Sequence, residues 1–284
     1  QDCSELFISE YIESINNNNA IEIYNPTASS INLAGYTINR YSNGASSGPE
    51  SWQLGGTIAS GDVIVVGNGQ LDSIDLGTYW SVPVDPVFYA LLDDHCNGDY
   101  DANSTFYFNG DDAMTLEKNG NIIDIFGKVG EDPGSAWTDD ASSGYTDANG
   151  GTWWTKRQTL IRKSSVKQGI TLNPILFNPT AEYDSLPDQT YTEMGSHNCD
   201  CITTSINNKD VTYVMYPNPT PKGENVVINS KSAISYIEIY NMLGEKIISE
   251  RTSIVSTEIL LKGAYLINIY FENGKSLRNK LIIE

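Results

Sequence analysis

The chain has 284 residues, enough for one large or two modest domains, and 39% of them are hydrophobic. Residues 205–284 hold nine Lys and Arg against eight Asp and Glu, so residues 1–204 hold the other eight basic and 28 acidic residues, a net charge of −20. A region this acidic repels phosphate backbones, and we expect no nucleic-acid partner. The sequence has no run of about 18 apolar residues, so we expect no membrane-spanning helix.

The first residues and the cysteines both indicate an exported protein. The chain opens QDCSELFISEY without Met, which we interpret as a mature terminus after removal of a signal peptide. With two histidines and no C-x-x-C pair the spacing fits no zinc module, and an even number of cysteines favours two disulfides. A ring between Cys199 and Cys201 would be strained, so we expect each to pair with a distant partner, Cys3 or Cys96.

Short apolar segments bounded by Asn, Gly, Asp or Ser recur in the first half of the chain. They predict strands and turns without a sustained helical period. Asn119-Gly120 predicts a hairpin with a two-residue turn, and strands at this spacing predict a sandwich or small barrel. One short helix is expected near residues 69–75. The segments are ELFISEYI (5–12), AIEIYN (20–25), YTINRY (36–41), DVIVVGN (62–68), STFYFNG (104–110), AMTLEKNG (113–120) and NIIDIFG (121–127).

Two segments, residues 41–51 and 128–152, are too long and irregular to be simple turns. Loops of this length in compact domains are usually functional or disordered. The aromatic residues of the second loop and its end allow two interpretations: they stack on sugar rings, or they fill the core or the end of a sandwich. We favour the second, above all for the first of them. They are Trp137, Tyr145, Trp153 and Trp154.

The acidic stretch DDHCNGDYDANSTFYFNGDD, residues 93–112, is the candidate metal site. Asp99, Asp101 and Asn103 alternate as at the start of a calcium loop, and Asp111 and Asp112 follow one strand later. Ca²⁺ takes several oxygen ligands, which such a turn can supply. The central glycine and the distal glutamate of an EF-hand are missing, so a solvated acidic turn without bound calcium is the alternative.

The sequence offers little catalytic chemistry. It contains no G-x-S-x-G, H-E-x-x-H or P-loop motif. His95 lies next to a cysteine in an acidic turn, and His197 lies in GSHNCDC; each is better explained as a structural or surface residue than as a general base. The many pairs of carboxylates follow from the acidic composition. We therefore expect a protein that is not an enzyme.

A polar stretch that is poor in core residues, ITTSINNKDVTY (202–213), predicts a linker before a second series of strands. Asn273-Gly274 predicts another hairpin within that series. The strand segments are NVVIN (225–229), ISYIEIYN (234–241), EKIISE (245–250), TEILL (257–261), AYLINIYF (264–271) and SLRNKLII (276–283).

This C-terminal region resembles the type A sorting domain of the Bacteroidetes type IX secretion system. The matching segments are YPNPT (216–220), ISYIEIYNMLGEKI (234–247), LLKGAYLINIYFENGK (260–275) and the ending RNKLIIE (278–284). The prolines stiffen the entry to the first strand, and the glycines give turns the freedom they need. The motif residues are Tyr216, Pro217, Asn218, Pro219, Gly244, Gly263 and Lys280.

The resemblance implies a route out of the cell. A signal peptide would take the chain across the inner membrane, and the folded protein would then pass the outer-membrane translocon. The sorting domain would be bound by an outer-membrane shuttle barrel. In the family this domain is usually removed, and the cargo is released or joined to a surface lipopolysaccharide. The near-neutral charge of the region suits protein–protein contact.

The N-terminal 204 residues resemble a bacterial lamin-tail domain, which implies an Ig-like β-sandwich. Where the family pattern leads us to expect Trp after Glu, this chain has Glu182-Tyr183, which keeps an aromatic residue, so we expect the packing to survive. Such domains often accompany enzymes as non-catalytic modules. The matching segments are LFISEYIESINNNNAIEIYNPTASSINLAGYTINRYSNG (6–44), GGTIASGDVIVVGN (55–68), FNGDDAMTLEKNGNIIDIFGKVGEDPGSAW (108–137), TLIRKSSV (159–166) and MGSH (194–197).

Two short segments, DSI (72–74) and DSL (184–186), resemble the Asp-Ser/Thr-apolar motif that Bacteroidetes glycosylate on the hydroxyl. Ser73 and Ser185 are the candidate acceptors. Three-residue motifs often arise by chance, so an unmodified serine is the alternative at each position.

We therefore predict an all-β protein: an Ig-like lamin-tail β-sandwich over residues 1–204, a linker over 205–213 and a small β-sandwich sorting domain over 214–284. Three functions fit this organisation. The first is a non-catalytic exported module that binds a surface glycan or protein, in adhesion or gliding motility. The second is an accessory component of the secretion or gliding machinery, retained on its shuttle barrel. The third is a calcium-dependent surface hydrolase or a sugar-binding module.

Overall fold

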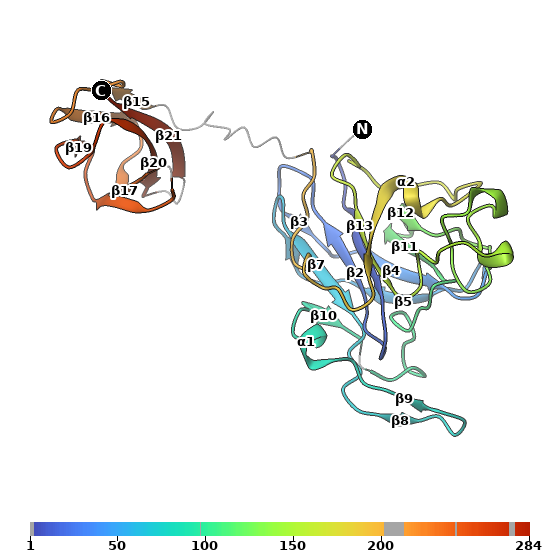
Figure 1. Cartoon of the computed structure of the whole chain (residues 1–284). Coiled ribbons are helices and arrows are strands. Elements are labelled where there is room, and N and C mark those ends of the chain that lie inside the picture. The colour runs from blue at the N-terminus through green and yellow to red at the C-terminus, as the bar shows by residue number, and fades with distance from the viewer. Residues whose placement is uncertain (1–2, 97, 202–212, 242, 273–275) are drawn as a thin grey trace. The chain divides into compact units, whose positions relative to one another are not determined.

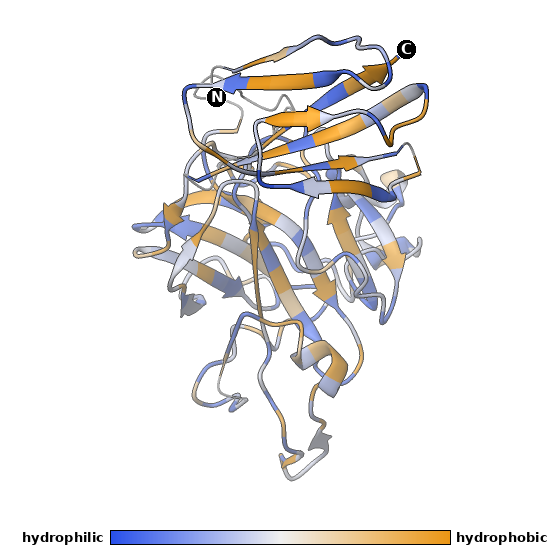
Figure 2. Ribbon diagram, turned by 90° about the vertical axis from the view of Figure 1, so that its left-hand side faces the viewer, coloured by the Kyte–Doolittle hydropathy of each residue, from blue (hydrophilic) through white to orange (hydrophobic). Residues whose placement is uncertain are grey.

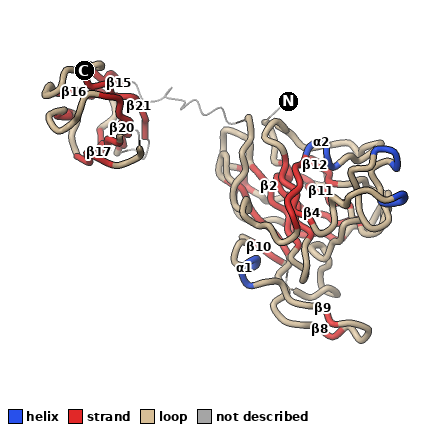
Figure 3. The backbone as a smooth tube through the Cα atoms, in the orientation of Figure 1, coloured by secondary structure: helices blue, strands red, loops and turns tan. Residues whose placement is uncertain are grey.

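The computed structural model of the chain describes residues 3–96, 98–201, 213–241, 243–272 and 276–284. The chain divides into two compact units, residues 1–203 and 204–284, and each is described by itself (Figure 1). Strands dominate both units and the helices are short, which confirms the all-β prediction (Figure 3). Of the expected linker, residues 205–213, only Tyr213 lies among the described residues, and it begins a strand.

The larger unit, unit 1, is built around two main sheets. In chain order its elements are β1 (Phe7–Glu13), β2 (Asn19–Tyr24), β3 (Ile31–Asn32), β4 (Tyr36–Tyr41), β5 (Glu50–Gln53), β6 (Thr57–Ile58), β7 (Val63–Gly67), β8 (Ile74–Asp75), β9 (Trp80–Ser81), α1 (Pro86–Tyr89), β10 (Asp94–His95), β11 (Ala113–Lys118), β12 (Asn121–Phe126), η1 (Ala141–Ser143), η2 (Asp147–Asn149), β13 (Gln158–Arg162), α2 (Pro179–Glu182) and β14 (Tyr183–Pro187). The six-stranded sheet has the order β10-β7-β2-β1-β13-β14, and the four-stranded sheet has the order β12-β11-β4-β5. The short pairs β3-β6 and β8-β9 stand apart from both.

The core of unit 1 lies between these two sheets. Ile8 and Ile21 from the six-stranded sheet pack with Ile38, Met114 and Leu116 from the four-stranded sheet, and all five are fully buried. Figure 2 shows that hydrophobic residues are spread along the strands. Two mostly antiparallel sheets packed face to face in this way form a β-sandwich.

The hairpin predicted at Asn119-Gly120 is confirmed. Strands β11 and β12 pair antiparallel on either side of it, and the two turn residues have φ angles of 51° and 76°. Asn and Gly adopt this left-handed conformation more readily than other residues, which is why this dipeptide marks tight hairpins.

The short helix predicted near residues 69–75 is wrong. The Oδ1 of Asn68 accepts a hydrogen bond from the N–H of Gln70 at 2.9 Å, which turns the chain at the point where a helix would begin. Strand β8 then pairs with β9 in a hairpin instead. In Figure 1 this β8–β9 hairpin projects away from the two main sheets.

A segment that we call the strap, residues 188–201, covers the face of the six-stranded sheet that points away from the four-stranded sheet. The ring of Tyr191 packs on that of Phe88, with centroids 5.1 Å apart. The ring of His197 lies edge-on to that of Tyr24 at 5.0 Å. Because the strap and the core cover opposite faces, every residue of β1 and β2 is buried, polar residues included.

The polar residues buried in β1 and β2 include three carboxyl groups. Glu10 lies opposite Glu22 in the register of the two strands. Glu22 accepts hydrogen bonds from the hydroxyl of Ser9 at 2.6 Å and from the N–H of Gly195 in the strap at 2.8 Å, whereas the Oε1 of Glu10 has no partner among the described residues. Burial is the main cause that raises the pKa of Glu10 to about 8, of Glu22 to about 7 and of Glu13 to about 7.

A buried ion pair joins the two sheets. The guanidinium of Arg162 in β13 contacts the carboxylate of Asp124 in β12, and neither side chain has any exposed surface. Both partners also bind the backbone of β1: Asp124 accepts the N–H of Ile8 at 2.8 Å, and Arg162 donates to the carbonyl of Ile8 at 3.1 Å. A second carboxylate, that of Glu182, lies 2.5 Å from Arg162.

The expectation that Tyr183 preserves the packing is confirmed. Its side chain is 2% exposed and belongs to the core of unit 1. The guanidinium of Arg162 lies 5.3 Å from the centre of the Tyr183 ring and equally far from that of Phe7. Burial favours the neutral form of Arg162, but the attraction of Asp124 outweighs it and raises the pKa of Arg162.

The smaller unit, unit 2, forms a second β-sandwich. Its strands are β15 (Tyr213–Tyr216), β16 (Asn225–Ser230), β17 (Ile234–Tyr240), β18 (Lys246–Glu250), β19 (Ile254–Ser256), β20 (Gly263–Phe271) and β21 (Ser276–Ile283). One sheet has the order β15-β16-β19 and the other β18-β17-β20-β21. Ile228 and Val255 from the first sheet pack with Ile237, Ile267 and Leu281 from the second. The hairpin predicted at Asn273-Gly274 lies outside the described residues.

We expect Asp124→Ala to lower the free energy of unfolding of unit 1 by about 3–5 kcal/mol, because it leaves the charge of Arg162 buried without its partner. Urea unfolding of the full chain, followed by circular dichroism, measures the change. Lys118→Ala is the matched control: it removes the ion pair with Glu5, in which Lys118 is 42% exposed, and should cost about 1 kcal/mol or less. Equal losses in the two variants would contradict this account.

The three buried carboxyl groups should make unit 1 less stable as the pH rises. Their pKa values in the folded chain lie above the ordinary value of 4.5, so the folded state binds more protons than the unfolded state. The resulting stability is complete below about pH 4.5 and is lost as the pH rises through 7 and 8.

We therefore expect the free energy of unfolding to fall by roughly 2 kcal/mol or more between pH 5 and pH 8. Urea unfolding at a series of pH values tests this. Glu10→Gln should flatten the profile, whereas Glu50→Gln, at an exposed position, should leave it unchanged. A stability that rises over this range would show that the buried groups ionise without cost.

Candidate functional site

The YPNPT segment, residues 216–220, is attached to the last strand of unit 2. The side chain of Asn218 accepts the N–H of Ile282 at 2.9 Å and donates to the carbonyl of Lys280 at 2.8 Å. The backbone N–H of Thr220 then donates to the carbonyl of Ile282 at 3.0 Å. The flanking prolines have no N–H, so the amide of Asn218 supplies the hydrogen bonds that they cannot. This explains why an asparagine stands between two prolines.

The other motif residues occupy a strand end and turns. Tyr216 ends β15 and is 50% exposed. Gly244 lies between β17 and β18 with a φ of +84°, and Gly263 begins β20 with a φ of +153°. A Cβ atom would meet no described atom within 4 Å at either glycine, so backbone conformation rather than space requires glycine there. That the secretion machinery contacts these residues stays a prediction.

The candidate metal ligands do not come together. Asp99 accepts the N–H of Asp101 at 3.0 Å within a local turn, and the amide of Asn103 donates to the carbonyl of Ser51 at 2.9 Å. Among the described residues, no group of three or more His, Cys, Asp or Glu could hold a metal ion. Asp99 and Asp101 form an exposed acidic turn, and calcium binding there stays a prediction.

Asp112 has a structural role instead. It is fully buried, its carboxylate lies 2.8 Å from Nε of Arg40, and it accepts the N–H groups of Asn43 and Asn109 at 2.8 and 3.0 Å. A carboxylate with these partners has little capacity left for a cation. Its neighbour Asp111 has a pKa raised to about 6, first by burial and then by repulsion from Asp112.

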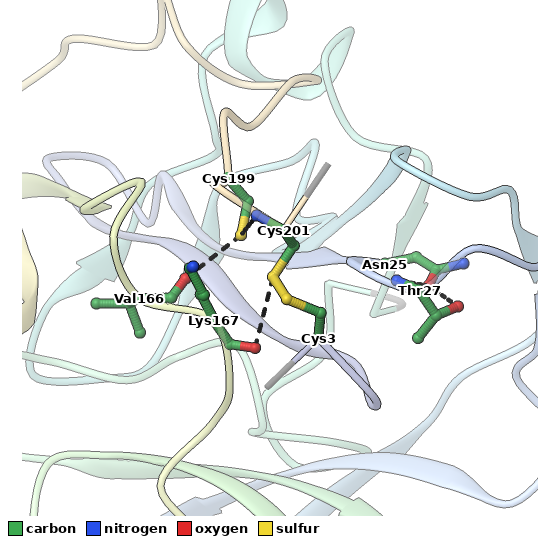
Figure 4. Close-up of a disulfide and its surroundings, with 7 residues drawn as sticks. All are labelled: Cys3, Asn25, Thr27, Val166, Lys167, Cys199 and Cys201. Carbon is green, nitrogen blue, oxygen red and sulfur yellow. Dashed lines mark hydrogen bonds between the residues drawn. A yellow bond between two sulfur atoms is a disulfide. The ribbon is translucent and has the colours of Figure 1, made fainter. Parts of the chain in front are cut away.

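One of the two expected disulfides is present. Cys3 is joined to Cys201, with a Cα–Cα distance of 5.5 Å (Figure 4). The expected second disulfide is wrong, because Cys96 and Cys199 are both buried free thiols. Cys96 belongs to the core between the two sheets, whereas Cys199, which is part of the strap, packs with Phe7 and Tyr24 on the opposite face of the six-stranded sheet. The sheet itself therefore separates the two sulfur atoms.

Thiol labelling tests this pairing. We expect the denatured, unreduced chain to take up two labels and the reduced chain four, counted by mass spectrometry. The double variant Cys3→Ser/Cys201→Ser should lose about 2–4 kcal/mol of stability, because the bridge closes a loop with a sequence separation of 198. Chains without any label before reduction would show that a second disulfide forms.

The aromatic residues of the long loop separate into two groups. Trp137 is fully buried in the core, and its indole N–H donates to Glu131 at 3.1 Å, which confirms the core interpretation for this residue. Trp154 packs partly buried against the same core. Tyr145 is half-buried. Trp153 is 40% exposed, with the ammonium of Lys156 lying 5.1 Å from the centre of its ring.

Both histidines make structural contacts. The Nε2 of His95 lies 2.8 Å from the hydroxyl of Tyr89, and its Nδ1 lies 3.0 Å from the carbonyl of Cys96. His197 lies against aromatic rings, and burial, with a smaller contribution from the charge of Arg162, lowers the pKa of His197 to about 4. A neutral, buried ring of this kind suits packing of the strap.

A cleft of about 370 Å³ opens beside the projecting β8–β9 hairpin. Its volume falls in the range of small-molecule sites, which is roughly 300–1,000 Å³. The hairpin forms one wall; residues of the β1–β2 turn, the acidic turn at 99–101 and residues 107–109 form the others. Sequence reasoning missed this cleft, because it expected a short helix near residues 69–75 and considered the acidic turn only as a calcium site or a solvated turn. The pair Tyr79-Trp80 in a polar, glycine-containing stretch was the available signal.

A polar network fixes the base of the hairpin. The Oε1 of Gln70 accepts hydrogen bonds from the hydroxyls of Ser81 and Tyr107, both at 3.0 Å. The amide of Asn17 donates to Ser81 at 3.0 Å and to the carbonyl of Val82 at 2.8 Å. These contacts join the hairpin to the β1–β2 turn and to the opposite wall, so the cleft is formed before any ligand arrives.

The two candidate glycosylation sites differ in accessibility. Ser73 is exposed just before β8, beside the cleft. Ser185 lies within β14, is half-buried and donates a hydrogen bond to Gln158 at 2.9 Å. Modification at either position stays a prediction, and the structure leaves only Ser73 freely accessible.

These features define an all-β protein of two units. In unit 2 the YPNPT segment is hydrogen bonded to the last strand, and unit 1 has an open cleft. Residues 1–130 match the family described as Lamin Tail Domain, and residues 214–284 match the Secretion system C-terminal sorting domain. The chain thus carries a lamin tail domain followed by a sorting domain, as the sequence resemblances predicted. None of the curated proteins searched matches the chain.

The two matches bear on the activity of the protein and on its location. Both are non-catalytic kinds of domain, and the sorting domain indicates export by type IX secretion to the cell surface or the extracellular space. No helix among the described residues is long and apolar enough to cross a membrane. The lamin-tail match ends at residue 130, yet β13 pairs with β1, and β14 pairs with β13 and completes the six-stranded sheet.

Proposed function

We propose that this chain is a non-catalytic protein carried to the cell surface by the type IX secretion system, with unit 2 as its sorting signal and unit 1 as a binding module. The observation that carries the proposal is the match of residues 214–284 to the sorting domain. Unit 2 also has its own apolar core, as a transferable signal requires. We place the sorting domain at 214–284 and the linker at 205–213.

The binding role that we propose for unit 1 is supported by the structural roles of its candidate chemical residues and by its open cleft. Two residues that sequence reasoning considered for chemistry have structural roles instead: Asp112 is in a buried ion pair, and His197 packs against aromatic rings. The cleft beside the β8–β9 hairpin is open and lined by both polar and aromatic groups. An outer-membrane shuttle barrel and the translocon are the partners that we propose for unit 2, and a surface glycan or protein for unit 1.

Export can be tested in a Bacteroidetes strain with an active type IX system. We expect the full chain, preceded by a signal peptide, to reach the surface or the medium, and a chain ending at residue 203 to stay in the periplasm. Residues 204–284 fused to a reporter should export that reporter. Asn218→Ala, which removes two hydrogen bonds to β21, should lower the exported fraction several-fold, whereas Asn229→Ala, on an exposed strand position, should not.

A strain without the translocon is the control, and export of the full chain from it would overturn the proposal. Intact-mass analysis of the exported protein separates two outcomes. A chain that has lost unit 2 indicates ordinary cargo. A full-length chain that co-purifies with the shuttle barrel indicates a retained accessory component of the secretion or gliding machinery.

A further inference from the structure

We propose that the cleft beside the β8–β9 hairpin binds a neutral carbohydrate, with the rings of Tyr79 and Trp80 as its stacking surfaces. The inference rests on the proposed function, since it names the class of ligand for the binding module in unit 1. It concerns a different set of aromatic residues from the long loop at 128–152.

Aromatic side chains gather at this cleft. Among the described residues of unit 1, four aromatic residues are strongly exposed, and three of them line the cleft: Tyr79 at 64%, Trp80 at 61% and Tyr100 at 47%. The fourth, Trp153, lies elsewhere. Exposed rings gathered at one concave place mark a binding site more often than rings scattered singly. The flat face of a sugar ring carries C–H groups, and this face can stack on an aromatic ring.

The remaining lining supplies a group that suits hydroxyls. Asn16 lines the cleft, and its amide can both donate and accept a hydrogen bond. A sugar hydroxyl can also donate and accept, so an amide and a hydroxyl can form a hydrogen bond in either direction. Aromatic rings for the C–H faces and an amide for the hydroxyls match the two kinds of surface that a carbohydrate presents.

The charge of the cleft argues against other ligands. Its ionisable residues are Glu13, Asp99, Asp101 and Arg157, an acidic balance that disfavours phosphate and sulfate groups. Two of the carboxylates already accept backbone N–H groups: Glu13 that of Arg157, and Asp99 that of Asp101. Glu13 is also buried, so only the two exposed carboxylates of the acidic turn are open to a cationic partner. A neutral ligand needs none of them.

The cleft is also held in shape before binding. Gln70, Ser81, Tyr107 and Asn17 bond to one another across its base, so the hairpin cannot swing without breaking several hydrogen bonds. A preformed site loses less conformational entropy on binding, which suits a ligand that offers only stacking and neutral hydrogen bonds.

Calorimetric titration of the purified full chain tests the proposal. The probes are four neutral hexasaccharides, built of β-linked glucose, xylose, mannose or N-acetylglucosamine. We expect at least one of them to bind, and Trp80→Ala and Tyr79→Ala to raise its Kd about tenfold or more. Trp153→Ala replaces an exposed tryptophan outside the cleft and should change the Kd less than about twofold. Binding should be unchanged by added NaCl, since no charges pair.

Three outcomes would overturn the proposal. In the first, none of the hexasaccharides binds. In the second, binding is lost in Trp153→Ala and kept in Trp80→Ala, which places the sugar elsewhere. In the third, hexalysine binds in a salt-sensitive way and no sugar does, which assigns the cleft to a cationic partner. The substituted side chains are exposed, and unchanged thermal unfolding of each variant verifies its fold. Export takes no part in this assay, so its failure leaves the sorting proposal untouched.

Discussion

The contact between Arg162 and Asp124 is the constraint on which the architecture of unit 1 depends. It is buried without exposed surface, and it links β13 of one sheet to β12 of the other. Both side chains also hydrogen bond to the backbone of Ile8 near the start of β1, so this inner strand is fixed from the side of the core. An ion pair in such a place tolerates little change of geometry, because each charge depends on its partner. It therefore sets the register in which the two sheets meet.

That constraint explains why the unit extends beyond the lamin-tail match. Arg162 lies in β13, and Glu182, its second carboxylate, comes just before β14, so both follow residue 130. The strap then continues from β14 across the outer face and buries β1 and β2 completely. A chain cut at residue 130 would leave Asp124 buried without its cation and the six-stranded sheet with an open edge. The segment that matches the lamin-tail family is thus shorter than the unit that folds together.

The sequence predicted the parts of the fold that local patterns determine. Alternating apolar segments and the Asn119-Gly120 turn depend on neighbours along the chain, and they were predicted correctly. The cysteine pairing depended on which face of a sheet each thiol occupies, and only the structure shows that Cys96 and Cys199 lie on opposite faces. The cleft could not be predicted either, because its lining comes from five separate stretches of chain. Its aromatic pair was visible in the sequence, but nothing local shows that these rings face a hollow.

The disulfide between Cys3 and Cys201 affects how unit 1 withstands proteolysis outside the cell. It joins the first described residue of unit 1 to the last described residue. A protease that cuts any single loop between them therefore produces two fragments that remain covalently tied, and the sandwich can keep its strands paired across the nick. The exposed β8–β9 hairpin and the long loop at 128–152 are the places where such cuts would fall first. A protein that works among extracellular proteases can thus present open loops without losing a piece of itself at the first cut.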